Sequence, residues 1–424
     1  MIGLANAIRY AALSLLITAA YGDSLVIKNV HVHPVTAPDI ENGQVLIVDG
    51  KIADVGKKVT GRGAKIIDGH GLDLYPGLIN AATNIGLEEI GSLRDTVDLN
   101  EIGEFNPQLM ARMSFNPASS HIDVTRSAGV TSVLTLPGSG GGRPGPEATV
   151  FYGQGAVMRL DGWTWDDMTV KAGAVLDMNF PVIGNAPPKP FPEMEKEYRK
   201  KLDQIADFFE NARRYQKAKA AANSDFKPDP RFEAMIPVLE GQRPVFVRAA
   251  RERAIKEAVA FADRQKIKII IAGPEEIGDT GPLLKARQIP VILGDTLALP
   301  LHDDSPYDSR YTLPNEFYKA GVKICFGTFD VQFARNVGFQ AAAAVAFGLP
   351  YDAAVKGVTI NAAEILGVDS QLGSIDKGKL ADLILTDGDP LEAKTNIKME
   401  FIDGKQVSLE NRQTQLYEKY LNRP

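Results

Sequence analysis

Apolar and polar residues alternate along the first part of the chain, as they do in half-buried strands. The segments 24–33 and 44–48 show this period of two, and Asp49-Gly50 follows as a turn that leads into a third run at 51–55. Alternation of this kind predicts antiparallel strands, and Asp-Gly is among the strongest short hairpin signals. We therefore predict a small antiparallel β meander near the N-terminus of the chain.

Short apolar runs alternate with helical patterns between residues 76 and 365. This alternation predicts βα units with a parallel sheet that is buried on both faces. The roughly 290 residues involved fit a closed (β/α)8 barrel better than an open sheet, because such barrels need about 250 residues. The predicted strands are 77–79, 131–135, 244–247, 267–271, 290–293 and 322–326, and the clearest helices are 193–222, 251–265 and 339–348.

Strand-like character returns near the C-terminus, at 381–385 and 397–401. The fold class that follows is α/β, a (β/α)8 TIM barrel with a small split β-sandwich domain formed by both chain ends. The expected boundaries are a small β domain at 23–75 and 366–410, the barrel at 76–365 and a C-terminal tail at 411–424.

The first 22 residues are typical of a secretory signal peptide. Arg9 precedes an apolar run, and Ala20-Tyr21-Gly22 suits the small residues of a cleavage site. The apolar run of roughly 11 residues is shorter than the ~20 that span a bilayer, and no later stretch is long and apolar enough to do so. We expect an exported protein, secreted or periplasmic; a frayed N-terminal helix of a cytosolic protein is the alternative.

Composition narrows the function classes. With 44% hydrophobic and 24% charged residues, the chain has the composition of a folded protein rather than a disordered one. A single cysteine excludes an intramolecular disulfide framework and a cysteine-based zinc or iron–sulfur site. The net charge of −6 provides no basic surface for nucleic acid.

Three segments together carry a family resemblance. They are 75–80 (Tyr-Pro-Gly-Leu-Ile-Asn), 361–368 (Asn-Ala-Ala-Glu-Ile-Leu-Gly-Val) and 373–385, which reads Gly-Ser-Ile-Asp-Lys-Gly-Lys-Leu-Ala-Asp-Leu-Ile-Leu. On these segments the chain resembles the amidohydrolase superfamily, and within it the imidazolonepropionase-like members. The last segment is a turn and strand in that family, so it indicates the fold and carries no chemistry.

The resemblance implies hydrolysis of C–N bonds in cyclic amides, N-acyl amino acids or dipeptides. Members of the family hold one or two divalent metals such as zinc at the C-terminal mouth of the barrel, where the metal lowers the pKa of a bound water. Their ligands are a His-x-His pair after the first strand, a carboxylated Lys or a Glu on the fourth, and single histidines after the fifth and sixth. An aspartate after the last strand transfers the proton.

This chain departs from that ligand pattern. Ala82 and Asn84 stand where the His-x-His pair belongs, and Arg248 and Ala272 replace the histidines after the fifth and sixth strands. The aspartate after the last strand comes one residue late, as Asp330, which turns its side chain to the opposite face. The fourth-strand ligand is left unassigned. Because a guanidinium repels a dication, we predict no resident metal or other cofactor.

The 5 histidines supply at most one ligand for the barrel mouth. His31 and His33 lie on a strand of the predicted meander and are interpreted as side chains of one strand face. His70 falls in a turn, and His121 falls in a helical stretch, where we expect it to face solvent. His302, in the loop after the seventh strand, is the histidine whose position allows it to line the mouth.

Loops that follow barrel strands form the usual ligand pocket of this fold, so polar residues there make up the candidate site. Asp330 is the candidate catalytic residue. The candidate ligand-binding residues are Asn80, Asn84, Arg248, Arg251, Glu275 and Arg335, with Thr83, Asp295, Thr296 and Asn336 as further pocket residues.

Arg248 has two interpretations. It either binds an acidic ligand group in a bidentate contact, or forms a salt bridge with Glu275 or Asp330 that fills the space of the metals. The neighbouring carboxylates Glu88-Glu89 are interpreted as solvated, because adjacent side chains usually point apart.

Three hypotheses follow for the function. The first is an exported amidohydrolase-superfamily protein whose binuclear metal site is lost and which is non-catalytic or assists a partner, either a metal-competent relative or a second copy of itself. The second is an active hydrolase with an altered one-metal or metal-free site that uses Asp330. The third is a binder of small anionic ligands held by Arg248 and Arg251.

Overall fold

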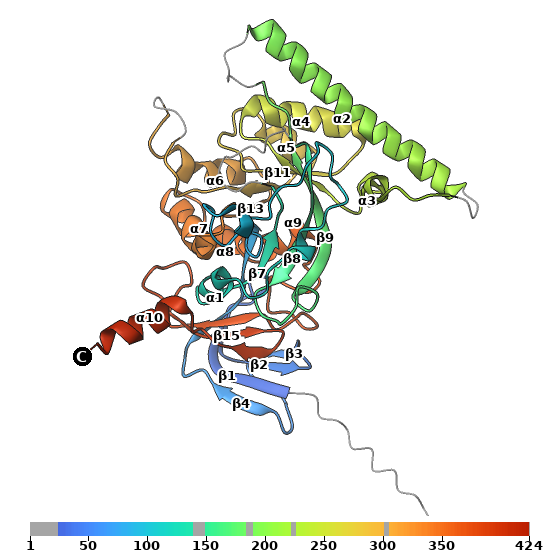
Figure 1. The fold of residues 1–424 in the computed structure, drawn as a ribbon. Coiled ribbons are helices and arrows are strands. Elements are labelled where there is room, and N and C mark those ends of the chain that lie inside the picture. Colours follow the sequence, from blue (N-terminus) through green and yellow to red (C-terminus); the bar gives the residue numbers. More distant parts are fainter. Residues whose placement is uncertain (1–23, 139–148, 184–189, 222–225, 301–304, 424) are drawn as a thin grey trace, which may run out of the picture.

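The computed structural model describes residues 24–138, 149–183, 190–221, 226–300 and 305–423, which form two eight-stranded sheets and a layer of helices (Figure 1). The predicted signal peptide at 1–22 and His302 lie outside the described residues. Among the helices described, each falls short of the length and apolar character that a membrane span requires.

The predicted barrel is confirmed as a nearly closed sheet. Its end strands meet where Gly327 packs on Ala82: a Cβ at Gly327 would lie 2.7 Å from the Cβ of Ala82, so glycine lets the two strands approach. In order around the sheet, the strands are β6 (Leu78–Thr83), β7 (Val130–Thr135), β8 (Phe151–Arg159), β9 (Thr169–Asn179), β10 (Val245–Arg248), β11 (Ile269–Ala272), β12 (Val291–Leu293) and β13 (Ile324–Phe326).

Strand β8 departs from an all-parallel barrel, because it runs antiparallel to both of its neighbours. It forms a hairpin with β9, and this hairpin stands in place of one βα unit (Figure 1). The residues of β8 are buried almost throughout, so the strand shows no alternation of polar and apolar positions. The hydrophobic pattern alone therefore did not reveal these two strands.

Successive residues of the barrel strands point alternately into the barrel and toward the helices. Val245 and Val247 pack in the outer core, whereas Phe246 packs in the interior core. Ile270 and Ala272 of the next strand also lie in the interior core. The same alternation directs the side chain at position 248 into the barrel, at the C-terminal ends of the strands.

Helices cover the outside of the barrel (Figure 1). The three helices predicted at 193–222, 251–265 and 339–348 are confirmed as α2 (Phe191–Ala220), α4 (Glu252–Gln265) and α7 (Val337–Ala346). The long α2 buries a stripe that includes Ile205 and Phe209. The other helical segments are α1 (Ser120–Arg126), α3 (Pro230–Leu239), α5 (Gly281–Ala286), α6 (Ser309–Lys319), α8 (Tyr351–Gly357), α9 (Ile360–Leu366), α10 (Arg412–Leu421) and the 3-10 turns η1 (Arg94–Thr96), η2 (Ala111–Met113) and η3 (Ala334–Asn336).

Strands from both chain ends form the second sheet. β5 pairs with β14 in antiparallel register, with Tyr75 opposite Ile384, and so joins the N-terminal strands to the C-terminal ones. The expected β-sandwich is therefore realised as one continuous sheet around its own buried core. Its strands are β1 (Ser24–Val32), β2 (Ile40–Val48), β3 (Lys51–Gly56), β4 (Lys65–Asp68), β5 (Asp73–Pro76), β14 (Leu383–Thr386), β15 (Ile397–Ile402) and β16 (Lys405–Val407).

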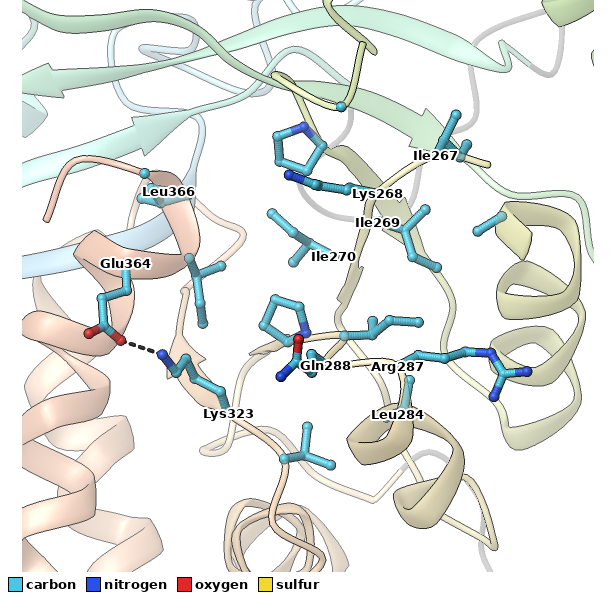
Figure 2. Close-up of a pocket in the computed structure, with 18 of the residues that line it drawn as sticks. Ile267, Lys268, Ile269, Ile270, Leu284, Arg287, Gln288, Lys323, Glu364 and Leu366 are labelled. Atoms are coloured by element: carbon cyan, nitrogen blue, oxygen red, sulfur yellow. Dashed lines mark hydrogen bonds and ion pairs between the residues drawn. The ribbon is translucent and has the colours of Figure 1, made fainter. Parts of the chain in front are cut away.

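A cavity of about 970 Å³ lies at the N-terminal ends of the barrel strands (Figure 2). Lys268 and Lys323, which come just before β11 and β13, line it. Two of its cations pair with carboxylates: Lys323 with Glu364, and Arg287 with Asp263. The cavity is thus at the opposite end of the barrel from the mouth, where residues of this fold serve stability rather than chemistry.

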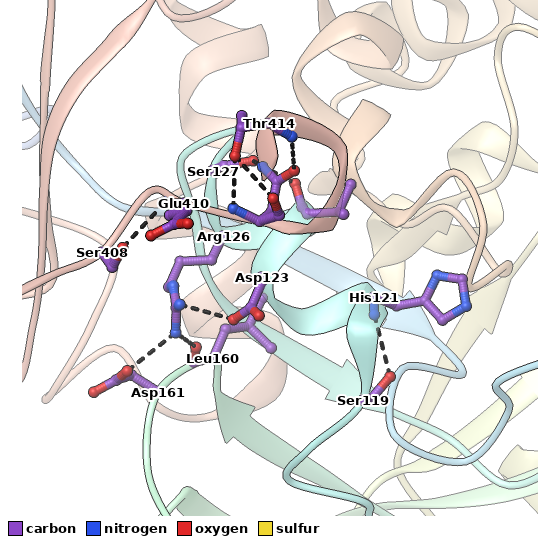
Figure 3. Close-up of polar contacts among 12 residues, drawn as sticks. Ser119, His121, Asp123, Arg126, Ser127, Leu160, Asp161, Ser408, Glu410 and Thr414 are labelled. Atoms are coloured by element: carbon purple, nitrogen blue, oxygen red, sulfur yellow. Dashed lines mark hydrogen bonds and ion pairs between the residues drawn. The ribbon is translucent and has the colours of Figure 1, made fainter. Parts of the chain in front are cut away.

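An ion pair connects the barrel to the second sheet, because Arg159 Nη1 of β8 lies 2.9 Å from Asp403 Oδ2, between β15 and β16. Figure 3 shows a further group of ion pairs, around Arg126. Arg126 of α1 donates to Asp123 Oδ1 at 2.8 Å and to Asp161 Oδ1 at 3.0 Å. Two carboxyl groups of the sheet, Asp382 and Glu400, are buried at the same junction. Burial raises the pKa of Asp382 to about 6, against the opposing charge of Arg159 and a hydrogen bond from the Asp403 N–H.

The raised pKa of Asp382 predicts a pH-dependent stability. Because the folded state binds this proton more tightly than the unfolded chain, the stability that protonated Asp382 contributes is full below about pH 4 and is lost as the pH rises through about 6. We expect D382N to be more stable than the natural protein at pH 7.5, by at most about 2–3 kcal/mol, and not at pH 4.5. Urea unfolding at both pH values measures this difference, with the exposed D95N as control; an equal pH slope in D382N and the natural protein would contradict it.

Candidate functional site

A carboxylate on β9 and a guanidinium on β10 meet inside the barrel mouth. The two strands are parallel, with Asp177 opposite Phe246, and Arg248 lies two residues beyond Phe246. Their contact is bidentate, because Arg248 Nε donates to Asp177 Oδ1 at 3.1 Å and Nη2 donates to Oδ2 at 2.8 Å. The guanidinium therefore engages both oxygens of the carboxylate.

This ion pair is shielded from solvent. Asp177 is fully buried, and the side chain of Arg248 is 21% exposed. Burial raises the pKa of Asp177, and the guanidinium of Arg248 opposes that rise. The Cζ of Arg248 also lies 5.5 Å from the ring centroid of Phe246 and 6.0 Å from that of Phe329, which adds cation–π attraction. One carboxylate and two aromatic rings therefore hold the guanidinium in place.

Phe329 covers the mouth above the ends of β11 and β12. Its ring lies 3.8 Å from the place that a Cβ would take at Gly273, and 3.7 Å from the corresponding place at Gly294. Its backbone has a φ of 55°, in the left-handed region that bulky residues rarely adopt. Its N–H donates to the carbonyl oxygen of Ala82 at 2.8 Å, which ties this conformation to β6. The ring is therefore fixed over the centre of the mouth.

Two of the predicted site residues, both asparagines, form hydrogen bonds at the rim of the barrel. Asn80 is fully buried, and its Nδ2 donates to Thr328 Oγ1 at 2.9 Å, which joins β6 to the segment after β13. Asn84 Nδ2 donates to the carbonyl oxygens of Leu136 and Gly138, at 3.0 and 3.1 Å. The Oδ1 of Asn84 is buried and has no hydrogen-bond partner within the described residues. Of the two asparagines, only Asn84 thus offers a spare acceptor.

The salt bridge predicted for Arg248 with Glu275 or Asp330 is wrong, since its partner is Asp177. Asp330 Oδ1 instead accepts from the N–H of Phe333 at 2.9 Å, and Glu275 pairs with Arg310 at 3.2 Å. The reason is geometric: Asp177 and Arg248 lie near the C-terminal ends of adjacent strands and both point into the barrel, whereas the other two acids lie in loops beyond their strands.

The other predicted arginines are spread around the rim. Arg251 is exposed at the residue before α4, and Arg335 is half-buried in η3. Of the further pocket residues, Thr83 Oγ1 donates to the carbonyl oxygen of Asp330 at 2.9 Å and Thr296 Oγ1 donates to that of Gln340 at 3.0 Å. The hydrogen bonds of these two hydroxyls therefore connect neighbouring segments of the rim.

Among the residues that the structure describes, those at the mouth do not fit a divalent metal. Ala82 and Ala272 have no donor atom, and both carboxylate oxygens of Asp177 are already bound by a permanent cation. A dication beside Arg248 would be repelled at a distance where burial leaves little screening. The ring of Phe329 occupies the space above the strand ends where ligands would converge.

Sequence reasoning missed Asp177 and misread two rim residues. Asp177 ends an apolar run, Ala174 to Leu176, and an acid within such a run is the signal that would have found it. Glu88 is half-buried rather than solvated, and burial and then the charge of Asp330 raise its pKa. His121 does not simply face solvent, since its Nε2 lies 3.0 Å from the carbonyl oxygen of Glu89.

Comparisons with known proteins agree on one group. Residues 312–407 match the Amidohydrolase family. The chain is 26% identical over 400 residues to "Amidohydrolase tasK" of Hapsidospora irregularis, covering 85% of this chain but only 39% of that protein's length. A 50-residue stretch is 48% identical to an imidazolonepropionase of Sphingopyxis alaskensis, over 12% of each chain. The crystal structure of an amidohydrolase from Thermotoga maritima MSB8 superposes with a TM-score of 0.79 at 28% identity, over 91% of this chain and 99% of that one.

Removal of one partner of the buried pair should destabilise the fold. We expect R248M to lower the free energy of unfolding by about 3–5 kcal/mol, because it leaves the Asp177 carboxyl buried without its partner. The double variant D177L/R248M should recover more than half of that loss, since two apolar side chains replace both charges.

Chemical denaturation measures these differences. R287M, which breaks the exposed pair with Asp263, is the matched control and should cost about 1 kcal/mol or less. An R248M protein as stable as the natural one would show that the pair does not hold the mouth together.

Proposed function

We propose that this chain, which resembles the amidohydrolase superfamily, is an exported member that has lost hydrolysis by metal-bound hydroxide and acts by assisting a partner. The observation that carries this proposal is the bidentate Asp177–Arg248 pair beneath the ring of Phe329. The pair places a permanent positive charge where superfamily catalysis needs a metal ion. Export is expected from the first 22 residues of the sequence.

Hydrolysis of a C–N bond in this superfamily depends on a water that a metal has made acidic. Without a metal, that water keeps its ordinary pKa and is a poor nucleophile at neutral pH. Asp177 cannot replace the metal as a general base, because both its oxygens accept from Arg248. Asp330 is held in its loop by one hydrogen bond, in which its Oδ1 accepts from the N–H of Phe333. The residues at the mouth thus support its shape rather than a reaction.

A partner-assisting role is supported by the side chains around the mouth. Ile102, Leu299, Tyr307 and Phe333 lie in loops on the C-terminal side of barrel strands and are 53–95% exposed. Contiguous apolar patches mark surfaces that bind another protein, and we propose that these four side chains belong to one such patch. We propose that the partner is a metal-competent relative or a second copy of this chain. The relative tasK is more than twice as long as the segment that aligns with this chain, which covers 39% of its length.

An active hydrolase with an altered site is the second candidate, and one observation favours it. Glu88 and Asp330 interact electrostatically at the rim, and burial together with the Asp330 charge raises the pKa of Glu88. A carboxyl group that keeps its proton to higher pH can act as a general acid toward a leaving group. The anion-binding hypothesis has less support, because the charge of Arg248 is already matched by Asp177.

The proposed loss of metal chemistry is tested by turnover. The purified protein, incubated with zinc or manganese, should show no hydrolysis above a metal-containing buffer on a panel of N-acyl amino acids, dipeptides and cyclic imides. The expected result follows from the positive charge at position 248. Turnover that a chelator abolishes, and that D177N also abolishes, would overturn the proposal.

The second candidate makes a different prediction on the same panel. Turnover that survives a chelator should fall about 100-fold in both E88Q and D330N, and should decline as the pH rises and Glu88 loses its proton. E89Q is the matched control, because Glu89 is the sequence neighbour whose carboxylate accepts from Asn116. Equal turnover in E88Q and E89Q would exclude a role for the Glu88 carboxyl group.

A further inference from the structure

Two histidines and an aspartate meet on two central strands of the second sheet, outside the barrel. β1 and β5 are parallel, with His31 opposite Asp73. Backbone bonds secure this register, since the His31 N–H donates to Leu72 O and the His33 N–H to Leu74 O, each at 2.9 Å. The period of two along β1 puts His31 and His33 on the same face. The strand pairing therefore brings these three side chains together.

One ligand atom from each of the three residues lies within 4.8 Å of the other two. His31 Nδ1 is 3.2 Å from Asp73 Oδ1, and His33 Nε2 is 2.9 Å from the same oxygen. Ligand atoms on a tetrahedral zinc ion are roughly 3.3 Å apart, given bonds of about 2.0–2.1 Å. A zinc ion thus fits among these atoms with small side-chain movements.

The outer nitrogens of both imidazoles face further carboxylates. His33 Nδ1 is 2.8 Å from Asp39 Oδ2, and His31 Nε2 is 3.4 Å from Glu41 Oε1. Metal-bound histidines usually donate their second N–H to a carboxylate or carbonyl in this way, which fixes the ring and its tautomer. Each histidine therefore has an inner nitrogen for a ligand bond and an outer nitrogen with a matching acceptor.

The hydrogen-bond partners of His33 favour a cation at the inner position. Its ring lies within hydrogen-bond distance of a carboxylate on both sides, and a neutral imidazole has one N–H to donate. A single dication shared by His31, His33 and Asp73 satisfies both inner nitrogens at once. It also offsets two of the three negative charges of Asp39, Glu41 and Asp73.

We propose that His31, His33 and Asp73 bind a zinc ion, with Asp39 and Glu41 as acceptors for the outer nitrogens. Two imidazole nitrogens and one carboxylate oxygen are a donor set that zinc prefers. The ring of His33 stacks on Tyr75, with centroids 4.1 Å apart, which orients it before metal binding. The three side chains are 15–30% exposed, so the ion can enter from solvent, and water completes its coordination. This site is independent of the barrel mouth and of the function proposed above.

Zinc binding to the whole protein tests the proposal. After treatment with a chelator and its removal, equilibrium dialysis should show one bound zinc per chain. H31Q and H33Q should each weaken that binding more than 100-fold, and D39N should weaken it 10–100-fold through the lost acceptor. H70Q is the matched control, since the side chain of His70 is 82% exposed in a turn, and it should bind zinc as the natural protein does. Cobalt provides a second readout, because its four-coordinate absorption should appear in the natural protein and be absent from H33Q.

Three outcomes would overturn the proposal. The first is no zinc bound at a free concentration of about 100 µM. The second is unchanged stoichiometry in H31Q and H33Q, with circular dichroism showing both to be folded; H31Q, the more exposed position, guards against misfolding of H33Q. The third is loss of the zinc in D177N but not in H33Q, which would place the ion in the barrel mouth and contradict the proposed function as well.

Discussion

The bidentate contact between Asp177 and Arg248 is the interaction on which the interpretation of the barrel depends. It joins two adjacent strands at their C-terminal ends, inside a mouth that is also covered by Phe329. A charged pair in this position is maintained because removal of either partner would leave an uncompensated charge in a buried place. The same contact that stabilises the mouth therefore excludes a dication from it.

The second sheet, which is built from both ends of the chain, connects directly to the barrel. β5 and β14 pair in the second sheet, and β5 continues almost directly into β6, the first barrel strand. Arg126 and the buried acids Asp382 and Glu400 lie where the sheet meets the barrel. The proposed zinc ligand Asp73 belongs to the same β5 strand. A metal bound there would fix the position of β5, the strand that leads into the barrel. Its role would be structural, in contrast to the metals that the family uses for catalysis at the barrel mouth.

Much of the fold could be predicted from the sequence, whereas the candidate site could be predicted only in part. Alternation marked the sheet strands, and helical periodicity marked α2, α4 and α7, because each buries one face. The β8–β9 hairpin was not predicted, since a strand buried on both faces shows no period. The partner of Arg248 was missed for the same reason, because Asp177 belongs to β9, the second strand of that hairpin. The contact between His31, His33 and Asp73 depends on pairing of β1 with β5 across forty residues of chain, which local patterns do not encode.

An experimental map of the barrel mouth tests the central claim most directly. Crystals grown with excess zinc, and measured at the zinc absorption edge, would locate any bound ion by its anomalous scattering. We expect the Arg248 guanidinium to stay within hydrogen-bond distance of both Asp177 oxygens, with no anomalous peak beside them. A peak coordinated by Asp177, with the Arg248 side chain turned out of the barrel, would show that the pair is only a resting arrangement of a metal site.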